Sequence, residues 1–370
     1  MKLTKDSILH LLRQRDERQL DSLWLEADET RRRNVGDGIY LRGIIEYSNI
    51  CCRMCHYCGL RCDNDGVSRY TLGADELVQA AHAIHHAGVG TVVLQSGEAA
   101  LMDLGAMVSC VRAIKSQTPL AVTLSFGELT EHELAVLRNA GADRYLLKFE
   151  TSNAELLHCV HPPRFDDRPG RIDILRTIRR LGYETGSGFM VGLPGQTYDD
   201  LANDILLLHE LDLDMIGIGP YLPHPATPMG KAPAAYSAPA GEQVPNDELT
   251  TYIALALARL ACPQANIPAT TAMVTLKGRD AYTYALARGA NVIMPNMTPH
   301  IYRSRYEIYP DRYGLDTGPV AAVADIRNLV ESAGRYIAAG RGDSLNRLLR
   351  IGMHTRGGKE QHNGCITCTG

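Results

Sequence analysis

A strand-like apolar run followed by a helical pattern occurs eight times along this chain of 370 residues. The runs are Leu41–Tyr47, Thr91–Ser96, Leu120–Ser125, Arg144–Glu150, Gly188–Leu193, Met215–Pro220, Ile267–Met273 and Val292–Pro295. Eight consecutive βα units have the size and rhythm of a closed (β/α)8 barrel, so they predict an α/β fold of the TIM type. A doubly wound open sheet is the alternative, disfavoured because no glycine-rich dinucleotide fingerprint follows the first run.

Helix signals lie between and around these runs. Residues 76–87 carry apolar side chains on one face and stop at Gly88, and Thr197 opens a helix with a capping-box partner at Asp200. The apolar set of the N-terminal helices is Ile8, Leu11, Leu12, Leu20, Leu23 and Leu25, and that of the C-terminal helical region is Val320, Val323, Ile326, Val330 and Ile337. We expect an N-terminal helical extension (residues 1–36), the barrel (37–316) and a C-terminal helix with a flexible tail (317–370).

The composition disfavours several classes of protein. A net charge of −4 provides no excess positive field to collect phosphates, so we expect no nucleic-acid partner. No apolar stretch approaches the roughly 18 residues of a membrane helix, and the N-terminus lacks the apolar core of a signal peptide. Of the ten cysteines, five fall within residues 51–62, unlike the spread of a secreted disulfide framework. We expect a cytoplasmic protein without a membrane span.

The densest cysteine cluster has the spacing Cys51-x3-Cys55-x2-Cys58 and directly follows the first strand-like run. Three thiolates this close can bind three irons of a cubane 4Fe–4S cluster, and without a fourth cysteine one iron stays open to another ligand. A zinc knuckle or a disulfide is the alternative, but zinc sites usually pair two close cysteines with two distant ligands. The spacing therefore predicts Cys51, Cys55 and Cys58 as the metal ligands, and leaves Cys52 and Cys62 outside the set.

Tyr57 precedes the last of these cysteines, and the form Cys-x3-Cys-x-Tyr-Cys resembles the signature of radical S-adenosylmethionine (SAM) enzymes. That resemblance implies that the open iron chelates the amino and carboxylate groups of SAM. It also implies that an electron from the cluster cleaves SAM to a 5′-deoxyadenosyl radical, which requires a reducing electron donor as a partner. Ser96-Gly97-Glu98 similarly resembles the Gly-Glu motif that holds the SAM amino group, and an ordinary acidic loop is its alternative.

Candidate binding residues fall where the other strand-like runs end, which is the catalytic face of a barrel. They are Thr123, Ser125, Lys148, Glu150, Met190, His224, Thr270, Thr271, Asn296 and Tyr302. The Pro-, Gly- and Ala-rich residues 226–246 are expected as a loop on the same face. Glu150 ends an apolar run, so its carboxylate needs either a ligand or a structural pair with Arg171. Thr270 and Thr271 offer hydroxyls to a substrate, or are simply β-branched strand residues.

Several longer segments are similar to one branch of the superfamily, the FeFe-hydrogenase maturases of the HydE type within the biotin-synthase-like group. The segments are Arg42–Asn49, Cys58–Arg61, Val93–Glu98, Gly182–Gly186, Met190–Thr197, Gly217–Pro220, Asn266–Met273 and Gly289–Asn296. The resemblance implies an enzyme that assembles the catalytic di-iron unit of FeFe-hydrogenase. Its implied substrate is a small organometallic species, a cysteine-ligated iron that carries carbon monoxide and cyanide and is supplied by a sister maturase.

The same resemblance implies roles for individual residues. Those that correspond to positions around SAM are Tyr57, Glu98, Glu150, Arg171, Met190 and Tyr302, and those of the substrate cavity are Thr123, Lys148, Thr270 and Thr271. Lys148-Phe149 stands where the family commonly has Arg-His, so a point charge replaces a planar guanidinium that can clamp an anion. This departure concerns the substrate more than the cluster or SAM.

Two other functions stay open from the sequence. A mutase similar to 3-methylornithine synthase has a related barrel, and needs acidic or serine groups to grip an amino-acid substrate. The segment Asn266–Met273 fits the maturase better. A non-catalytic iron–sulfur scaffold or electron carrier needs the cluster, but neither Glu98, Glu150 nor the threonines.

The C-terminal tail holds the last two cysteines, Cys365 and Cys368. Some members of the resembled family carry a second cluster on cysteines shortly after the barrel, but no cysteine closely follows Tyr309-Pro310 here. Two thiols cannot alone hold a cubane, although His354 or His362 would complete a mixed site. We expect one 4Fe–4S cluster per chain and no fixed metal in the tail.

Overall fold

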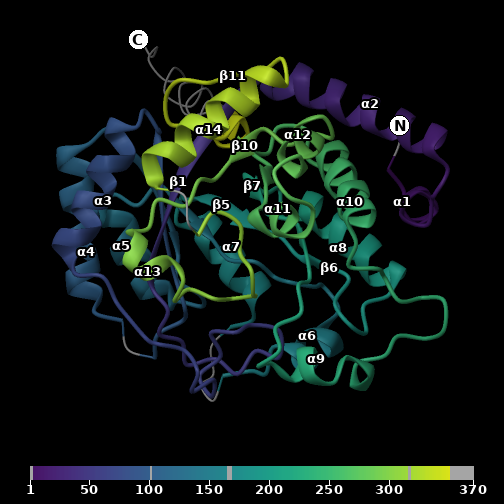
Figure 1. Cartoon of the computed structure of the whole chain (residues 1–370), viewed down its shortest axis with the longest axis horizontal. Helices are drawn as coiled ribbons and strands as arrows, with labels where there is room; N and C mark the ends of the chain where they lie inside the picture. Colours follow the sequence, from purple (N-terminus) through teal and green to yellow (C-terminus); the bar gives the residue numbers. More distant parts are fainter. Residues whose placement is uncertain (1–2, 101, 165–168, 316–317, 351–370) are drawn as a thin grey trace, which may run out of the picture.

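Eight parallel strands form a nearly closed barrel at the centre of the molecule (Figure 1) in the computed structural model, which describes residues 3–100, 102–164, 169–315 and 318–350. The barrel strands are β1 (Gly38–Ser48), β2 (Thr91–Ser96), β3 (Ala121–Ser125), β4 (Arg144–Leu146), β5 (Glu184–Ser187), β7 (Met215–Ile216), β9 (Pro268–Ala269) and β10 (Val292–Ile293). They pair in the order β7-β5-β4-β3-β2-β1-β10-β9, and a bridge between Met215 and Asn266 joins the two ends. The predicted TIM-type barrel is confirmed.

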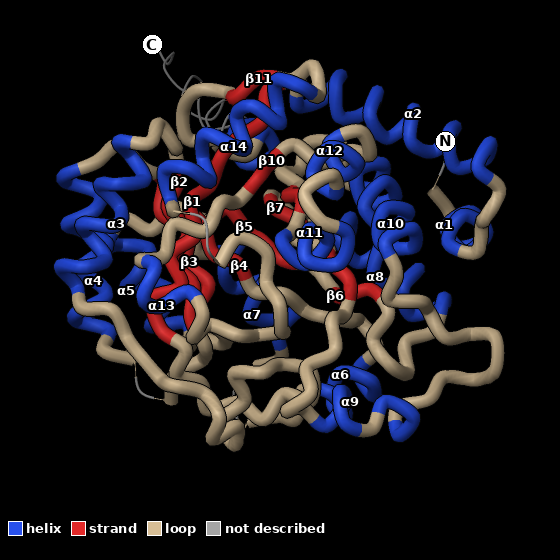
Figure 2. The backbone as a smooth tube through the Cα atoms, viewed as in Figure 1, coloured by secondary structure: helices blue, strands red, loops and turns tan. Residues whose placement is uncertain are grey.

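Figure 2 shows the strands surrounded by helices, with α3, α4 and α5 on one side and α8 and α10 on the other. The helices that follow barrel strands are α3 (Ala74–His86), α4 (Leu104–Gln117), α5 (Glu131–Ala140), α6 (Ala154–Val160), α7 (Arg171–Arg180), α8 (Tyr198–Glu210), α10 (Glu248–Ala261), α11 (Thr271–Lys277), α12 (Ala281–Leu286) and α13 (His300–Arg303). The capping box between Thr197 and Asp200 begins α8 as expected. Within the ranges described above, no helix has the length and apolarity to cross a membrane.

Two N-terminal helices pack on the outside of the barrel. They are α1 (Lys5–Leu12), which lies against α8, and α2 (Glu17–Val35), which lies against α10. Five of the six apolar residues expected to anchor them are buried, but Leu25 is 72% exposed because it lies on the outer face of α2. The loop between β8 (Gly219–Pro220) and α10 is irregular apart from the short helices α9 (Pro228–Lys231) and η1 (Pro233–Ala235).

The fifth barrel strand lies outside its expected run, and the fourth, sixth, seventh and eighth are shorter than expected. The fifth is Glu184–Ser187, and the expected run lies after it, where β6 (Met190–Val191) pairs with β8 in a separate two-stranded sheet. The strand was missed because it is polar, and its Glu184 is buried against Arg144 rather than packed among apolar side chains. The seventh is only two residues long, because Thr271 already begins α11.

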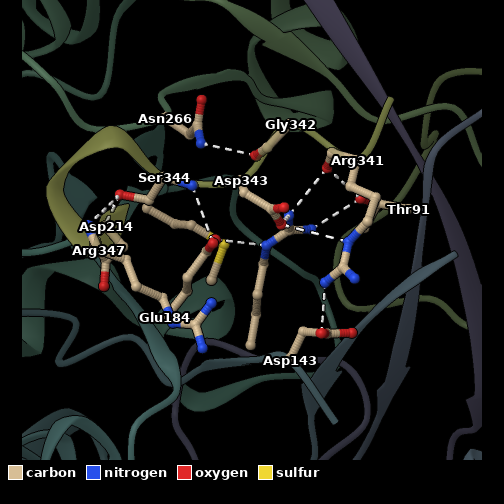
Figure 3. A network of polar contacts seen from close by, with 12 residues as sticks. Thr91, Asp143, Glu184, Asp214, Asn266, Arg341, Gly342, Asp343, Ser344 and Arg347 are labelled. Carbon is tan, nitrogen blue, oxygen red and sulfur yellow. Dashed lines mark hydrogen bonds and ion pairs between the residues drawn. The ribbon is translucent and has the colours of Figure 1, made fainter. Parts of the chain in front are cut away.

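The C-terminal segment seals the amino-terminal end of the barrel, which the sequence analysis did not predict. After α14 (Pro319–Ser332), the strand β11 (Tyr336–Ile337) pairs in parallel with the start of β1. Residues 341–344 then run across the beginnings of the strands, where they meet Thr91, Glu184 and Asn266 (Figure 3). The expected flexible tail, residues 351–370 with Cys365 and Cys368, lies outside the described residues.

Buried ion pairs hold this segment in place. The Arg144 guanidinium donates to Glu184 Oε2 (2.5 Å), to the Asp343 carboxylate (2.7 Å) and to the Arg341 carbonyl (2.9 Å). Glu184 Oε1 in turn accepts from the Ser344 backbone N–H (2.9 Å), and both Arg144 and Glu184 are almost fully buried. A charge buried to this degree needs its partner, because removing one member of such a pair leaves the other uncompensated.

Replacing Glu184 by Ala should lower the free energy of unfolding by about 3–5 kcal/mol, because Arg144 keeps only the half-buried Asp343 as a carboxylate partner and the Ser344 N–H loses its acceptor. Urea denaturation followed by circular dichroism measures the change. The control is Glu131→Ala, which breaks an exposed pair with Arg180 and should leave the midpoint unchanged. Equal effects of the two substitutions would contradict the role of the buried pair.

Candidate active site

A cavity of about 370 Å³ opens inside the barrel, bounded by the carboxyl-terminal ends of the strands and the loops that follow them. His224 and Asn296, candidates without an assigned role, do not line it, whereas Ser125 does. Among the thirteen residues assigned to the cluster, SAM or the substrate, twelve line it. They are Cys51, Cys55, Tyr57, Cys58, Glu98, Thr123, Lys148, Glu150, Arg171, Met190, Thr270 and Thr271. The carboxyl ends of parallel strands meet at one edge of a barrel, so residues far apart in sequence share this cavity.

The cysteine loop follows β1 and is fixed by backbone hydrogen bonds to other loops. The N–H groups of Cys52, His56 and Gly59 donate to the carbonyls of Glu98 (2.8 Å), Val160 (2.8 Å) and Ile308 (3.0 Å). Cys51, Cys55 and Cys58 line the cavity, whereas the side chain of Cys62 is exposed and contacts Met54. Gly97 crosses close to this loop, where a Cβ atom would lie 2.9 Å from the Cβ of Cys51.

The three thiols suit an iron–sulfur cluster better than chemistry as free cysteines. Burial raises the pKa of the Cys55 thiol to about 12, and also raises the pKa values of Cys51 and Cys58. Thiols in such an environment become thiolates only when a strong cation compensates their charge, as iron does. Within the described ranges no group of three His, Cys, Asp or Glu side chains is arranged for a single metal ion. A cubane places each cysteine on a separate iron.

Glu98, proposed as a SAM ligand, lies in a buried ion-pair network. Its carboxylate accepts from Arg53 (3.2 Å), from Arg164 (2.5 Å) and from the backbone N–H of Glu128 (3.0 Å). The carboxylate therefore holds the motif loop against the cysteine loop, while the backbone of Ser96 and Gly97 also lines the cavity. A contact of Glu98 with SAM stays a prediction.

Glu150 carries two independent signs of a binding role. Its backbone has a φ of 65°, a left-handed conformation that costs energy for a residue with a side chain. Its Oε2 atom is buried without a hydrogen-bond partner, and its Oε1 lies 3.7 Å from Arg171. The alternative of a structural pair with Arg171 is the weaker one, because the Arg171 Nε donates to Glu128 at 2.7 Å.

Most of the proposed substrate residues present polar atoms to the cavity. The buried Thr123 hydroxyl has no hydrogen-bond partner, and Thr270 donates its own to the Ile218 carbonyl (3.0 Å). Lys148 lines the cavity, and within the described ranges its ammonium has no carboxylate within ion-pair distance. Thr271 lines the cavity at the first residue of α11.

Tyr302 is the thirteenth of the residues assigned to the cluster, SAM or the substrate, and it does not line the cavity. Its ring stacks on Tyr70 with centroids 4.8 Å apart, and its hydroxyl donates to Glu76 (2.9 Å). Tyr306, which lies four residues further and beyond the end of α13, is buried and lines the cavity. The proposed contact between Tyr302 and SAM has no support from this geometry.

Comparison with known proteins decides the family. Residues 45–208 match the Radical SAM superfamily. Over 317 residues the chain is 42% identical to the FeFe hydrogenase maturase subunit HydE of Thermotoga maritima, a match that covers 85% of this chain and 86% of that protein. The chain belongs to the HydE family of radical SAM enzymes. As in other radical SAM proteins, its cofactors are a 4Fe–4S cluster and SAM.

More distant relatives share the barrel. The 3-methylornithine synthase of Methanosarcina acetivorans is 25% identical over 79% of each chain. A crystal structure of methylornithine synthase (PylB) superposes with a TM-score of 0.76 at 23% identity, covering 91% of this chain and 95% of that one. Identity this low shows the fold alone, so the HydE relationship is the specific one.

Sequence reasoning missed a group of buried charged residues behind the cluster loop of this HydE-family chain. Glu128 accepts hydrogen bonds from Arg53 (3.0 Å) and Arg171 (2.7 Å), and Nε2 of His161 lies 3.2 Å from its Oε1. Burial raises the pKa of the Glu128 carboxyl, but His161 and the two guanidinium groups outweigh burial and hold this pKa well below its usual range. His161 completes the group, and burial lowers its pKa to about 3. The signal available in the sequence was weak: an arginine inside the cysteine loop and a histidine before two prolines.

The first prediction for this site concerns the ligands. Cys55→Ala should abolish bound iron and SAM cleavage, because two thiolates cannot hold a cubane. Cys52→Ala should retain about four irons per chain, since only the other three line the cavity. Iron analysis of the reconstituted proteins measures both. Loss of the cluster from Cys52→Ala with retention in Cys51→Ala would reverse the assignment, and about eight irons in the full chain would mean a second cluster.

The second prediction concerns Glu150. Glu150→Gln should weaken SAM binding about ten- to a hundredfold, because a charge-assisted hydrogen bond is worth about 1.5–3 kcal/mol. Equilibrium binding of SAM to the cluster-loaded protein measures the loss, and iron content should stay constant. The matched control is Glu155→Gln, an exposed glutamate in the first turn of α6. Equal affinities for the Glu150 and Glu155 variants would place Glu150 in a structural role.

Proposed function

We propose that this protein acts in assembly of the FeFe-hydrogenase di-iron cofactor, on a small cysteine-ligated iron that carries carbon monoxide and cyanide. The observation that carries the proposal is the cavity itself, with three cluster thiols on one wall and Lys148 and Thr123 elsewhere in its lining. Its volume of about 370 Å³ lies in the range of cavities that enclose small ligands. We also propose that the protein acts in the cytoplasm, without attachment to a membrane, and that a sister maturase supplies its substrate.

The charge of the cavity favours an anionic substrate. Five cationic side chains line it against three carboxylates, the cations being Arg42, Arg53, Lys148, Arg171 and Arg312 and the carboxylates Glu46, Glu98 and Glu150. Arg53, Arg171 and Arg312 have carboxylate partners within ion-pair distance. Arg42 has none in the described part of the chain, but its guanidinium donates to the Met215 sulfur and to the Gly342 carbonyl at the closed end of the barrel. Lys148 has no carboxylate partner among the described residues either, so its charge is available to a cyanide or carboxylate group.

The same carboxylates weigh against an amino-acid mutase. A lysine-like substrate needs acidic groups for its ammonium groups, but Glu46 is paired with Arg312 and Glu98 with Arg53. Glu150 alone of the three keeps a buried oxygen without a partner. If SAM takes that oxygen, no carboxylate of the cavity lining is left for a second ammonium group.

The chain's own residues position the reactants and exclude water. When bound, the cluster and SAM supply a reductive cleavage that yields methionine and a 5′-deoxyadenosyl radical. Cys51, Cys55 and Cys58 would hold the cluster at one wall, and Glu150 would fix the polar part of SAM. Lys148 and the threonine hydroxyls would orient the anionic iron complex. Residues 341–344 close the far end of the barrel.

Two assays on the reconstituted, reduced protein test the proposal. The protein should convert SAM to 5′-deoxyadenosine, because the three cysteine thiols and the Glu150 carboxylate proposed to bind SAM line one cavity. It should also restore hydrogen evolution to a maturation mixture that contains the sister maturases and apo-hydrogenase but lacks a HydE protein. Lys148→Met should lower maturation more than SAM cleavage, because it removes the substrate's positive partner.

Each alternative predicts a different result. A non-catalytic scaffold would bind iron and form no 5′-deoxyadenosine. A mutase would form 3-methylornithine from lysine and leave the hydrogenase inactive. Lys148→Arg is the matched control for Lys148→Met, since it keeps the positive charge and restores the guanidinium that the family commonly has.

A further inference from the structure

His161 lies directly behind the cysteine loop, between a cluster thiol and a buried arginine. It follows the last residue of α6 and is 6% exposed. Its Nδ1 is 3.0 Å from the Sγ of Cys55 and 2.9 Å from the hydroxyl of Tyr57, and its ring stacks on the Tyr57 ring. On the other side, its Nε2 is 2.9 Å from Nη2 of Arg171 and 3.2 Å from Oε1 of Glu128.

The surroundings decide which ring nitrogen carries the proton. A guanidinium has only donors and an ionised carboxylate only acceptors, so Nε2 of His161 either accepts from Arg171 at 2.9 Å or donates to Glu128 at 3.2 Å. The shorter contact favours the tautomer in which Nε2 accepts from Arg171. Glu128 does not depend on a histidine proton, because Arg53 and Arg171 already donate to its carboxylate. A neutral imidazole has one N–H, which is therefore on Nδ1 and points at the Cys55 sulfur and the Tyr57 hydroxyl.

We propose that His161 is a positioning residue that donates an N–H···S hydrogen bond to the Cys55 thiolate and thereby sets the reduction potential of the cluster. The inference rests on the proposed function, because it takes Cys55 as a cluster ligand. Hydrogen bonds to cluster sulfurs stabilise the more electron-rich reduced state and so raise the potential. Arg171 strengthens this bond by withdrawing electron density through Nε2.

This arrangement connects the cluster with the cavity. The Arg171 guanidinium that donates to His161 also lies 3.7 Å from the Glu150 carboxylate, which faces the proposed SAM site.

The test is a redox titration of the reconstituted full chain, followed by electron paramagnetic resonance, in four proteins. His161→Leu removes the donor and should shift the midpoint potential downward at unchanged iron content. His161→Asn keeps an amide N–H at the position of Nδ1 and should hold the potential near that of the unaltered protein. Tyr57→Phe removes the competing acceptor, so its potential should be equal or higher.

The outcomes separate this inference from the proposed function. About four irons in every protein, with the same potential in His161→Leu as in the unaltered chain, would overturn the role of His161 and leave the proposed function intact. Failure of the unaltered chain to bind iron or cleave SAM would overturn the proposed function instead. If His161→Leu does not assemble a cluster, His161→Gln replaces it, since its longer side chain moves the amide away from Cys55. A potential that falls in Tyr57→Phe but not in the histidine variants would make Tyr57 the donor.

Discussion

The placement of the active site depends on one buried carboxylate, that of Glu128. Its Oε2 accepts from Arg53 of the cysteine loop, and its Oε1 accepts from Arg171 at the start of α7. His161, directly after α6, lies 3.2 Å from Oε1. Arg53 follows β1, Glu128 follows β3, and both His161 and Arg171 follow β4, so strand geometry alone does not fix how they meet. Two arginines lower the cost of burying the carboxylate, and the carboxylate in turn holds both guanidinium groups in a fixed orientation.

The two ends of the barrel use buried charge in different ways. At the amino-terminal end, Arg144, Glu184 and the C-terminal segment satisfy one another, which makes a rigid closure. At the carboxyl-terminal end, the Thr123 hydroxyl and one Glu150 oxygen line the cavity and have no hydrogen-bond partner. Unsatisfied buried polar atoms are costly, so these two are groups to which a bound ligand can supply the missing hydrogen bonds.

The sequence predicted what is local and missed what is distant. The three cysteines lie within eight residues of one loop, so their spacing alone predicts them as a set, and seven of the eight barrel strands overlap the expected apolar runs. Strand β5 was not predicted because its Glu184 is compensated by residues at least 40 positions away, Arg144 among them. His161 and Glu128 were not predicted as site residues, because a single histidine or glutamate gives no periodic signal in the sequence and its partners are distant along the chain. Tyr302 was misplaced relative to the cavity because its short helix faces Tyr70 instead.

Lys148 differs from the arginine that the family commonly has at this position, which changes how the site can bind an anion. The family commonly has an arginine there, whose planar fork binds a carboxylate or cyanide in a fixed orientation. Lys148 keeps the charge but not the fork, and the adjacent Phe149 is fully enclosed against Phe189. Under the proposed function, orientation of the anionic substrate must then come from neighbours that are already rigid, and Thr123 on β3 and Thr270 beside β9 are such groups. The proposed recognition of the anion thus rests on separate hydroxyls on different strands rather than on a single guanidinium.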